Sequence, residues 1–258
     1  MHSNNDVSVI IHTYKGEATQ HVLEAIASAH KLTSNIIVID MESTPAVREQ
    51  IKKNAVKIVS FPFSHYVEPA RAFGIQQANT DWVFILDADE RITSELAAEI
   101  KERIQSTKYS YYKVPRKNIF GKVKWLKSGG WWPDHQMRLI HKPDFKSWPK
   151  QIHATPVING EMGYLDSPLL HYFHGDLQGM VQKTTLFENI ESDLLYKANR
   201  PVKTSTFFRK FVGELYRRLL KNRGFMDGPI GVIESIYQAY SKTITYLYLY
   251  EKKHSSNL

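Results

Sequence analysis

Four short apolar runs, separated by stretches of helical spacing, constrain the fold of this chain more than any other feature. The runs are rich in β-branched residues and occupy positions 7–11, 35–39, 56–59 and 82–86. The run at 56–59 is weaker, because it contains Lys57. Short runs of this kind are typical of strands buried on both faces of a parallel sheet. Stretches with the apolar spacing of helices alternate with them, at about 17–30, 45–54, 67–78 and 93–106. Strands that alternate with helices predict βαβ units, and therefore an α/β fold.

Polar residues stand where three of these runs end. Thr13 and Tyr14 follow the first run, Asp40 follows the second, and Asp87 and Asp89 follow the fourth. The carboxyl ends of parallel strands meet at one edge of an open sheet, and ligands bind there. These five residues therefore outline one candidate site.

The two carboxylates after the fourth run point to a divalent cation. Residues i and i+2 of an extended segment face the same way, so Asp87 and Asp89 are placed to share a ligand. Mg²⁺ and Mn²⁺ prefer carboxylate oxygens, and Mg²⁺ is typically held by one or two carboxylates together with substrate phosphates. The same pattern in isolation also fits a solvated turn before a helix. The neighbouring strand ends favour the metal site.

Three segments, in this order, resemble family-two inverting glycosyltransferases: 7–14, 37–44 and 81–90. Further segments are similar to the bacterial lipopolysaccharide-core glucosyltransferase branch, at 61–63, 71–75, 129–139 and 169–172. The resemblance covers roughly residues 6–175. It implies an α/β fold of the GT-A class, with a Rossmann-like nucleotide-binding sheet, to which a helical C-terminal extension is added. The loop at 15–17 and the segment 41–45 depart from the family pattern and leave the donor open.

The resemblance implies a nucleotide-sugar donor, with a UDP-sugar expected by family habit, and Mn²⁺ or Mg²⁺ as cofactor. The expected metal ligands are Asp89, Asp87 and His171. The residues expected on the nucleotide and its diphosphate are Thr13, Tyr14, Glu17, Asp40, Arg71, Asp87 and Arg138. A cation at Asp89 would stabilise the leaving diphosphate, and the Arg71 guanidinium suits phosphate. The alternatives are a core histidine for His171 and a solvated helix charge for Arg71.

Inverting transfer also needs a base that removes the proton of the attacking hydroxyl group, and a carboxylate is the usual solution. We expect Asp134 in this role, because Trp131, Trp132 and Pro133 before it could shape an acceptor pocket. Glu90 is the competing candidate, although it resembles a structural neighbour of the carboxylate pair. A plain turn residue after proline is the other interpretation of Asp134.

Length and composition fit one α/β domain with an appendage. The chain has 258 residues, 42% of them hydrophobic, and no cysteine, which excludes a disulfide scaffold and a thiolate metal site. We expect a GT-A domain at 1–175 and a basic, mainly helical extension at 176–258. Within the domain, 1–107 would bind the nucleotide-sugar, and 108–175 would form the acceptor side.

Most of the net charge of +8 lies near the C-terminus, where residues 200–258 contain 11 Lys and Arg against 4 Asp and Glu. Apolar residues recur there at helical spacing, namely Phe208, Phe211, Val212, Leu215 and Leu219. Basic residues gather on the other side of this predicted helix. A basic amphipathic helix of this kind is a candidate for lying on an anionic membrane surface. Packing on its own domain is the alternative.

The N-terminal residues lack the pattern of a signal peptide, and no apolar stretch reaches about 18 residues. We therefore expect a cytoplasmic protein that can lie on the inner face of the cytoplasmic membrane. Residues 108–128 carry seven Lys and Arg among aromatic residues, without an acidic one. This stretch fits either an anionic acceptor or a solvated hairpin.

The leading hypothesis is a metal-dependent inverting glycosyltransferase that acts on a glycolipid or oligosaccharide acceptor of the cell envelope. One alternative is a nucleotidyltransferase, which expects a glycine-rich phosphate loop that residues 12–17 fit poorly. The other is a basic nucleic-acid-binding protein, for which no reader motif is found. We expect no nucleic-acid partner, and the oligomeric state stays open.

Overall fold

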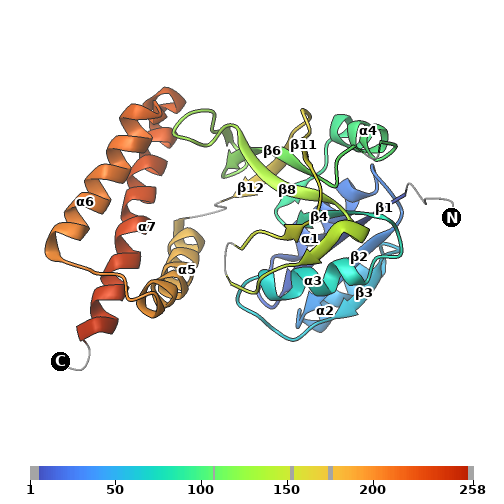
Figure 1. The fold of residues 1–258 in the computed structure, drawn as a ribbon, viewed down its shortest axis with the longest axis horizontal. Coiled ribbons are helices and arrows are strands. Elements are labelled where there is room, and N and C mark those ends of the chain that lie inside the picture. Colours follow the sequence, from blue (N-terminus) through green and yellow to red (C-terminus); the bar gives the residue numbers. More distant parts are fainter. Residues whose placement is uncertain (1–5, 107, 152–153, 174–176, 255–258) are drawn as a thin grey trace. The chain divides into compact units, whose positions relative to one another are not determined.

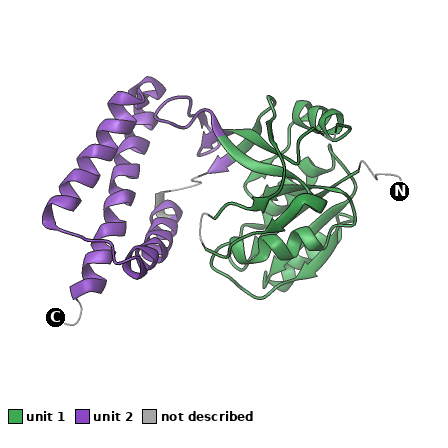
Figure 2. Cartoon of the chain, viewed as in Figure 1, with its two compact units in different colours: residues 1–116, 135–171 green, residues 117–134, 172–258 purple. Residues whose placement is uncertain are grey.

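The computed structural model describes residues 6–106, 108–151, 154–173 and 177–254. The chain divides into two compact units (Figure 2). Unit 1 comprises residues 1–116 and 135–171, and unit 2 comprises residues 117–134 and 172–258. Each unit is described by itself below.

Unit 1 holds most of a mixed sheet, with helices on both faces (Figure 1). Its helices are α1 (Thr19–Ala29), α2 (Pro45–Lys52), α3 (Glu68–Gln76) and α4 (Ser94–Arg103), with the 3₁₀ turn η1 (Lys142–Asp144). Its first strands are β1 (Val7–Tyr14), β2 (Ile36–Met41), β3 (Lys57–Ser60), β4 (Trp82–Asp87) and β5 (Glu90–Arg91). The later strands, three of which continue into unit 2, are β6 (Tyr111–Phe120), β8 (Asp134–His141), β9 (Phe145–Ser147), β10 (Val157–Ile158), β11 (Met162–Tyr164) and β12 (Leu169–Phe173).

The described strands of the main sheet follow the order β3-β2-β1-β4-β8-β6-β12-β5, and β7 and β11 also pair with β6. Strand β1 pairs in parallel with β2 and β4, and β2 pairs in parallel with β3. This arrangement confirms the parallel α/β sheet predicted from the four apolar runs. Strand β8 pairs antiparallel with β4, so the sheet is mixed beyond that point.

Alternate residues of the central strands face opposite sides of the sheet. Val9 and Ile11 of β1 pack with α1, α2 and α4 on one side, whereas Ile10 packs with α3 on the other. All three side chains are fully buried. Because helices cover both faces, the strands need apolar residues at most positions, and this requirement explains the apolar runs.

Threonine side chains fix the starts of the helices that follow β2 and β5. Thr44 Oγ1 accepts the N–H of Val47 at 3.4 Å before α2, and Thr93 Oγ1 accepts the N–H of Leu96 at 3.1 Å before α4. Each cap satisfies a backbone donor that has no partner inside its helix. Helices α2 and α4 therefore begin at fixed residues soon after β2 and β5.

Unit 2 is mainly helical. Its elements are β7 (Lys124–Trp125), α5 (Leu177–Lys197), α6 (Thr204–Leu215), the π-helix η2 (Tyr216–Lys221), the 3₁₀ turn η3 (Gly224–Asp227) and α7 (Gly228–His254). Helices α5 and α6 both pack on α7 (Figure 1). None of the described helices is both long enough and apolar enough to cross a membrane.

The loop after β7 is hydrogen-bonded to these helices. Residues 117–134 therefore belong to unit 2, whereas the sequence predicts them in the first domain. The N–H groups of Lys127 and Ser128 donate to the buried carboxylate of Asp227 at 2.9 and 2.7 Å. The N–H of Gly129 donates to the carbonyl of Asn222 at 2.7 Å. These contacts join residues about 100 positions apart, so local spacing did not predict them.

The close approach of α3 to the sheet depends on Gly74. A Cβ atom there would lie 2.8 Å from Cγ2 of Ile10 and 3.2 Å from Nε2 of His12. We expect Gly74→Ala to lower the free energy of unfolding, because overpacking costs about 1–3 kcal/mol and exceeds the gain in helix propensity of at most about 1 kcal/mol. Urea denaturation followed by circular dichroism measures the change. Gly213→Ala in α6, where a Cβ atom meets nothing within 4 Å, is the control and should be neutral or stabilising.

Candidate functional site

The carboxyl ends of β1, β2 and β4 lie side by side, as the sequence predicts. In the parallel pairing His12 is opposite Asp87, and Thr13 is opposite Asp40. The sheet therefore brings three of the predicted residues to one edge. What these side chains contact decides which of them could meet a ligand.

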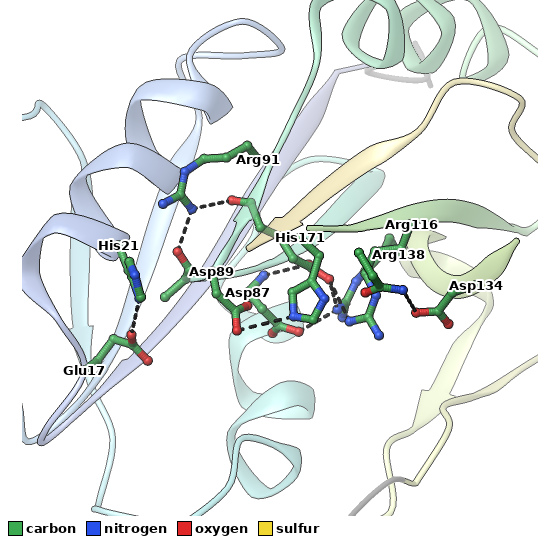
Figure 3. Close-up of polar contacts among 12 residues, drawn as sticks. Glu17, His21, Asp87, Asp89, Arg91, Arg116, Asp134, Arg138 and His171 are labelled. Atoms are coloured by element: carbon green, nitrogen blue, oxygen red, sulfur yellow. Dashed lines mark hydrogen bonds and ion pairs between the residues drawn. The ribbon is translucent and has the colours of Figure 1, made fainter. Parts of the chain in front are cut away.

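Asp87 is held between Arg71 and Arg138. Figure 3 shows Asp87 beside Arg138. Nη2 of Arg71 lies 2.7 Å from its Oδ1, and Nη2 of Arg138 lies 2.5 Å from its Oδ2. Burial alone would raise the pKa of Asp87, but Arg138 and Arg71 outweigh it and hold that pKa well below its usual range. Because both oxygens accept from guanidinium groups, Asp87 is a poor candidate for a metal ligand and a strong one for positioning the arginines.

Glu90 completes this network from below the surface. It is fully buried, and its Oε1 accepts from Arg138 at 2.5 Å and from Arg116 at 3.3 Å. Its Oε2 accepts the backbone N–H of Asp87 at 3.0 Å. Burial would lower the pKa of Arg138, but Asp87 and Glu90 raise it above its ordinary value. Glu90 thus acts as a structural anchor, and a buried carboxylate with these partners is unsuited to the alternative role of base.

His12 lies beside the network in its neutral form. Burial, followed by the positive charge of Arg71, lowers the pKa of His12 to about 3. Its Nε2 lies 3.4 Å from the carbonyl of Ala70, and its Nδ1 has no partner among the described residues. A neutral imidazole leaves the charge of the network unchanged at physiological pH.

The network leaves guanidinium N–H groups available for a ligand. Three guanidinium groups, from Arg71, Arg116 and Arg138, face two carboxylates. Within the described part of the chain, Nε and Nη1 of Arg71 and Nε of Arg138 have no hydrogen-bond partner. Buried donors without a partner cost about 1–3 kcal/mol each. Such donors at a strand edge are suited to an anionic ligand.

Asp89 does not share the direction of Asp87. Strand β4 ends at Asp87, and residues 88–89 form a turn before β5, so the extended geometry assumed for the pair is absent. Asp89 instead lies 3.4 Å from Nε2 of His171, which the pairing of β12 with β5 brings to the turn (Figure 3). Their side chains are 28% and 13% exposed. Two predicted metal ligands, Asp89 and His171, are therefore adjacent and accessible.

No three His, Asp or Glu side chains in the described ranges gather closely enough to hold a metal by themselves. Asp89 and His171 would thus be two protein ligands among others supplied by the substrate or by water. This number fits Mg²⁺ or Mn²⁺, which commonly take one or two protein groups together with phosphate oxygens.

The other predicted nucleotide residues are engaged in local contacts. Asp40 is buried and accepts from Nε of Arg48 at 2.8 Å and from the N–H of Ser43 at 2.9 Å. Glu17 contacts Nδ1 of His21 at 3.1 Å, at the start of α1. Thr13 is fully buried, and its hydroxyl group has no partner among the residues described.

Tyr14 lies close to the two acidic residues of this edge. Its pKa is raised by burial first, and then by the negative charges of Glu17 and Asp89. The phenol therefore stays neutral and can donate a hydrogen bond at any physiological pH.

Asp134 belongs to unit 2 and is the first residue of β8. Its Oδ2 accepts from Nδ2 of the buried Asn118 at 3.0 Å, and the same amide nitrogen donates to the carbonyl of Trp131 at 3.2 Å. Asn118 thereby fixes the carboxylate against the tryptophan segment that precedes it. The predicted role of Asp134 as a base stays a prediction.

Sequence reasoning missed His12 and Arg116 as members of the site. His12 directly precedes Thr13 at the end of β1, a position that could have suggested it. Arg116 lies in the basic stretch 108–128, where nothing distinguishes it from six other cationic residues. Only the pairing of β6 within the sheet selects it.

Comparison with known proteins gives one family. The model of glycosyl transferase family 2 matches residues 8–161. An uncharacterized glycosyltransferase of Rickettsia conorii is 24% identical over 241 residues, which cover 88% of this chain and 84% of the relative. Another, of Rickettsia typhi, is 23% identical over 249 residues, with coverages of 92% and 84%.

Two solved structures are similar at lower identity. Residues 1–349 of S. aureus TarS, in complex with UDP-GlcNAc, align with a TM-score of 0.49 and 13% identity, over 97% of this chain and 92% of that one. The mannosyltransferase PcManGT from Pyrobaculum calidifontis, in complex with GDP-Man and Mn²⁺, aligns with a TM-score of 0.46 and 12% identity, over 92% and 73%.

The arginine network predicts a large stability effect at Arg138. Replacing it by methionine leaves Asp87 and Glu90 with one guanidinium group each, and breaking a buried ion pair typically costs about 3–5 kcal/mol. We expect Arg138→Met to lower the free energy of unfolding by about 3 kcal/mol in urea denaturation.

Arg217→Met is the matched control for this variant. Arg217 pairs with Glu214 at the surface, where its side chain is 47% exposed, so we expect a loss below about 1 kcal/mol. Equal effects of the two variants would contradict the importance given to the buried network.

Proposed function

The chain belongs to glycosyl transferase family 2, and we propose that it transfers a sugar, with inversion, from a nucleotide-sugar to an acceptor of the cell envelope. The family and the mixed α/β sheet confirm the predicted GT-A fold class. Family membership also favours glycosyl transfer over the nucleotidyltransferase and nucleic-acid-binding alternatives. The donor, the metal, the base and the acceptor are the parts of the proposal that follow.

The available guanidinium N–H groups of the arginine network are the observation that carries the proposal of a nucleotide-sugar donor. Arg71, Arg116 and Arg138 gather at the strand edge. Nε and Nη1 of Arg71 and Nε of Arg138 have no hydrogen-bond partner among the described residues. A sugar diphosphate concentrates negative charge in a small volume, and a guanidinium fork matches phosphate oxygens. We propose that the diphosphate lies beside Asp87, within the field of Arg71, Arg116 and Arg138. By family habit the nucleotide is UDP.

Asp89 and His171 fit the metal that the family implies. A carboxylate and an imidazole are both ligands that Mn²⁺ accepts, and the pair is partly exposed at the same strand edge. The cation would supply Lewis-acid stabilisation of the leaving diphosphate. Asp87 fits less well because its two oxygens are taken by guanidinium groups. We propose that it keeps Arg71 and Arg138 in place.

Asp134 is our proposal for the base. In an inverting transfer the acceptor hydroxyl oxygen bonds to the anomeric carbon from the face opposite the diphosphate. The bond to the diphosphate breaks, its electron pair leaves with the phosphate oxygen, and the hydroxyl proton passes to the base. Asn118 holds one oxygen of Asp134, which fixes the orientation of the carboxylate for this transfer.

A glycolipid or polysaccharide precursor of the cell envelope is the proposed acceptor, met at the inner face of the cytoplasmic membrane. The resemblance of residues 129–139 and 169–172 to the lipopolysaccharide-core glucosyltransferase branch supports this class. The seven basic residues of 108–128 also suit an acceptor with phosphate groups.

The metal assignment predicts the effect of removing Asp89. In calorimetric titration of UDP into the full chain, we expect Mn²⁺ to tighten binding and Asp89→Ala to abolish that gain, with a loss of at least about tenfold in Kd, or about 1.4 kcal/mol. Asp166→Ala is the control, because the Asp166 carboxylate is 93% exposed. If Mn²⁺ does not change the UDP affinity of the unmodified chain, the metal assignment is wrong. The fold assignment would not be affected by that result.

The base assignment predicts a separation of binding from transfer. Asp134→Asn keeps an acceptor for the Asn118 amide but cannot take a proton, so we expect unchanged UDP affinity and a rate about 10²–10⁴-fold lower. The rate is measured as UDP release from UDP-glucose, with water or an added oligosaccharide as acceptor. Asp144→Asn, which removes a carboxylate paired with His141, is the control. Transfer at the normal rate would show that another group is the base.

A further inference from the structure

Helix α7 of unit 2 buries several polar residues beside Tyr237, Ala239 and Leu249, and it exposes several large apolar ones. On α7 the buried residues include Glu234, Ser235, Ser241 and Thr245. Large apolar residues of the same helix are exposed, namely Ile233, Ile236, Tyr240 and Leu247. A helix that packs only on its own domain places its apolar side inward. The pattern therefore indicates that the outer surface of unit 2 has another partner.

Several of the polar side chains inside unit 2 are paired by hydrogen bonds between α5 and α7. The carboxylate of Glu188 on α5 accepts from the hydroxyl groups of Ser241 and Thr245 on α7. The hydroxyl group of Tyr237 donates to the carbonyl of Met180 at 2.7 Å. These contacts hold α5 on α7 without the exposed apolar side chains, which stay available for another contact.

The clearest exposed row lies on α6 and η2. Phe208, Val212, Tyr216 and Leu220 recur at every fourth residue, and their exposures run from 42% for Val212 to 74% for Phe208. Phe225 and Met226 of η3 follow, at 52% and 62%. We call these six residues the apolar stripe.

The stripe differs from the apolar face expected from the sequence. Phe211, Leu215 and Leu219 were expected on that face, but the structure leaves them half-buried. An α-helix has about 3.6 residues per turn, so a row of residues four apart drifts around the helix. The π-helix η2 has a wider turn, which returns Leu220 to the side on which the row began. The exposed row therefore continues beyond the end of α6.

Charge decides which partner fits the stripe. Residues 203–227 carry seven Lys and Arg against two acidic residues, and Arg209, Lys221 and Arg223 are exposed among the apolar side chains. A second copy of this chain would bring the same positive charges to a symmetric contact, which like-charge repulsion opposes. An anionic lipid surface supplies both an apolar layer and negative headgroups.

We propose that the apolar stripe is a membrane-docking surface, which lies in the interface of an anionic bilayer with Phe208, Leu220, Phe225 and Met226 inserted among the headgroups. Exposed basic residues next to the stripe bind the anionic headgroups. This inference extends the proposed function, since a lipid-linked acceptor resides in such a bilayer. The membrane-binding test needs no sugar donor, no acceptor and no sugar transfer. The docking proposal and the proposed function can therefore fail separately.

The test uses the absence of cysteine from the chain. A single cysteine introduced by Met226→Cys in the full chain is labelled with an environment-sensitive fluorophore. Vesicles of phosphatidylcholine with about 30% phosphatidylglycerol are compared with phosphatidylcholine alone. We expect a blue shift with the anionic vesicles only. The same label at Val157→Cys, an exposed apolar position of unit 1, is the control and should not shift.

Flotation of unlabelled chain with the same vesicles tests the stripe directly. We expect Phe208→Ser combined with Leu220→Ser to weaken binding at least about tenfold, with UDP affinity and helix content unchanged. Val157→Ser is the matched control and should bind as the unmodified chain does. The proposal is overturned if the unmodified chain does not float with anionic vesicles, or if the double variant floats equally well. It is also overturned if light scattering shows a dimer that the double variant dissolves, because the stripe would then join two copies.

Discussion

The burial of two carboxylates, Asp87 and Glu90, among three guanidinium groups is the interaction on which the rest of the site depends. Arg71 comes from α3, Arg116 from β6 and Arg138 from β8, so the network ties the segment from the end of β4 to β5 to three other elements. A buried charge is costly unless it is paired, and these elements therefore cannot shift independently. The same constraint fixes the turn at 88–89, and with it the direction in which Asp89 points.

The local pattern of apolar residues was sufficient to predict the buried central strands of unit 1. A strand covered on both faces must be apolar throughout, so the runs that end at Ile11, Ile39 and Leu86 mark three central strands. Parallel strands bring their carboxyl ends together without any further information. The gathering of Asp40 and Asp87 at one edge follows from these two rules, and the register confirms it.

The remainder of the site rests on contacts that no local pattern records. Arg116 joins Glu90 because β6 and β5 are parts of the same sheet, yet its neighbours in sequence are equally basic. The assumption that residues 87 and 89 share a direction was wrong because β4 ends between them. A helical period likewise predicts α6, but not which of its sides is covered. That choice depended on the packing of α6 against α7, as in the ring contact of Phe207 with Tyr250, and on a π-turn that lengthens the row.

Positive charge occupies two different environments in this chain, and we propose a different purpose for each. At the strand edge the guanidinium groups are largely buried and partly neutralised, so salt screens their field little, and it is suited to one compact anion at a fixed place. On α6 and η2 the basic residues are exposed and stand among apolar side chains. Dissolved salt screens the electric field of these residues within about 10 Å. Such a field is suited to an extended anionic surface and not to a single anionic group. The proposed donor site and the proposed docking surface thus follow from one physical distinction, the depth at which the charge lies.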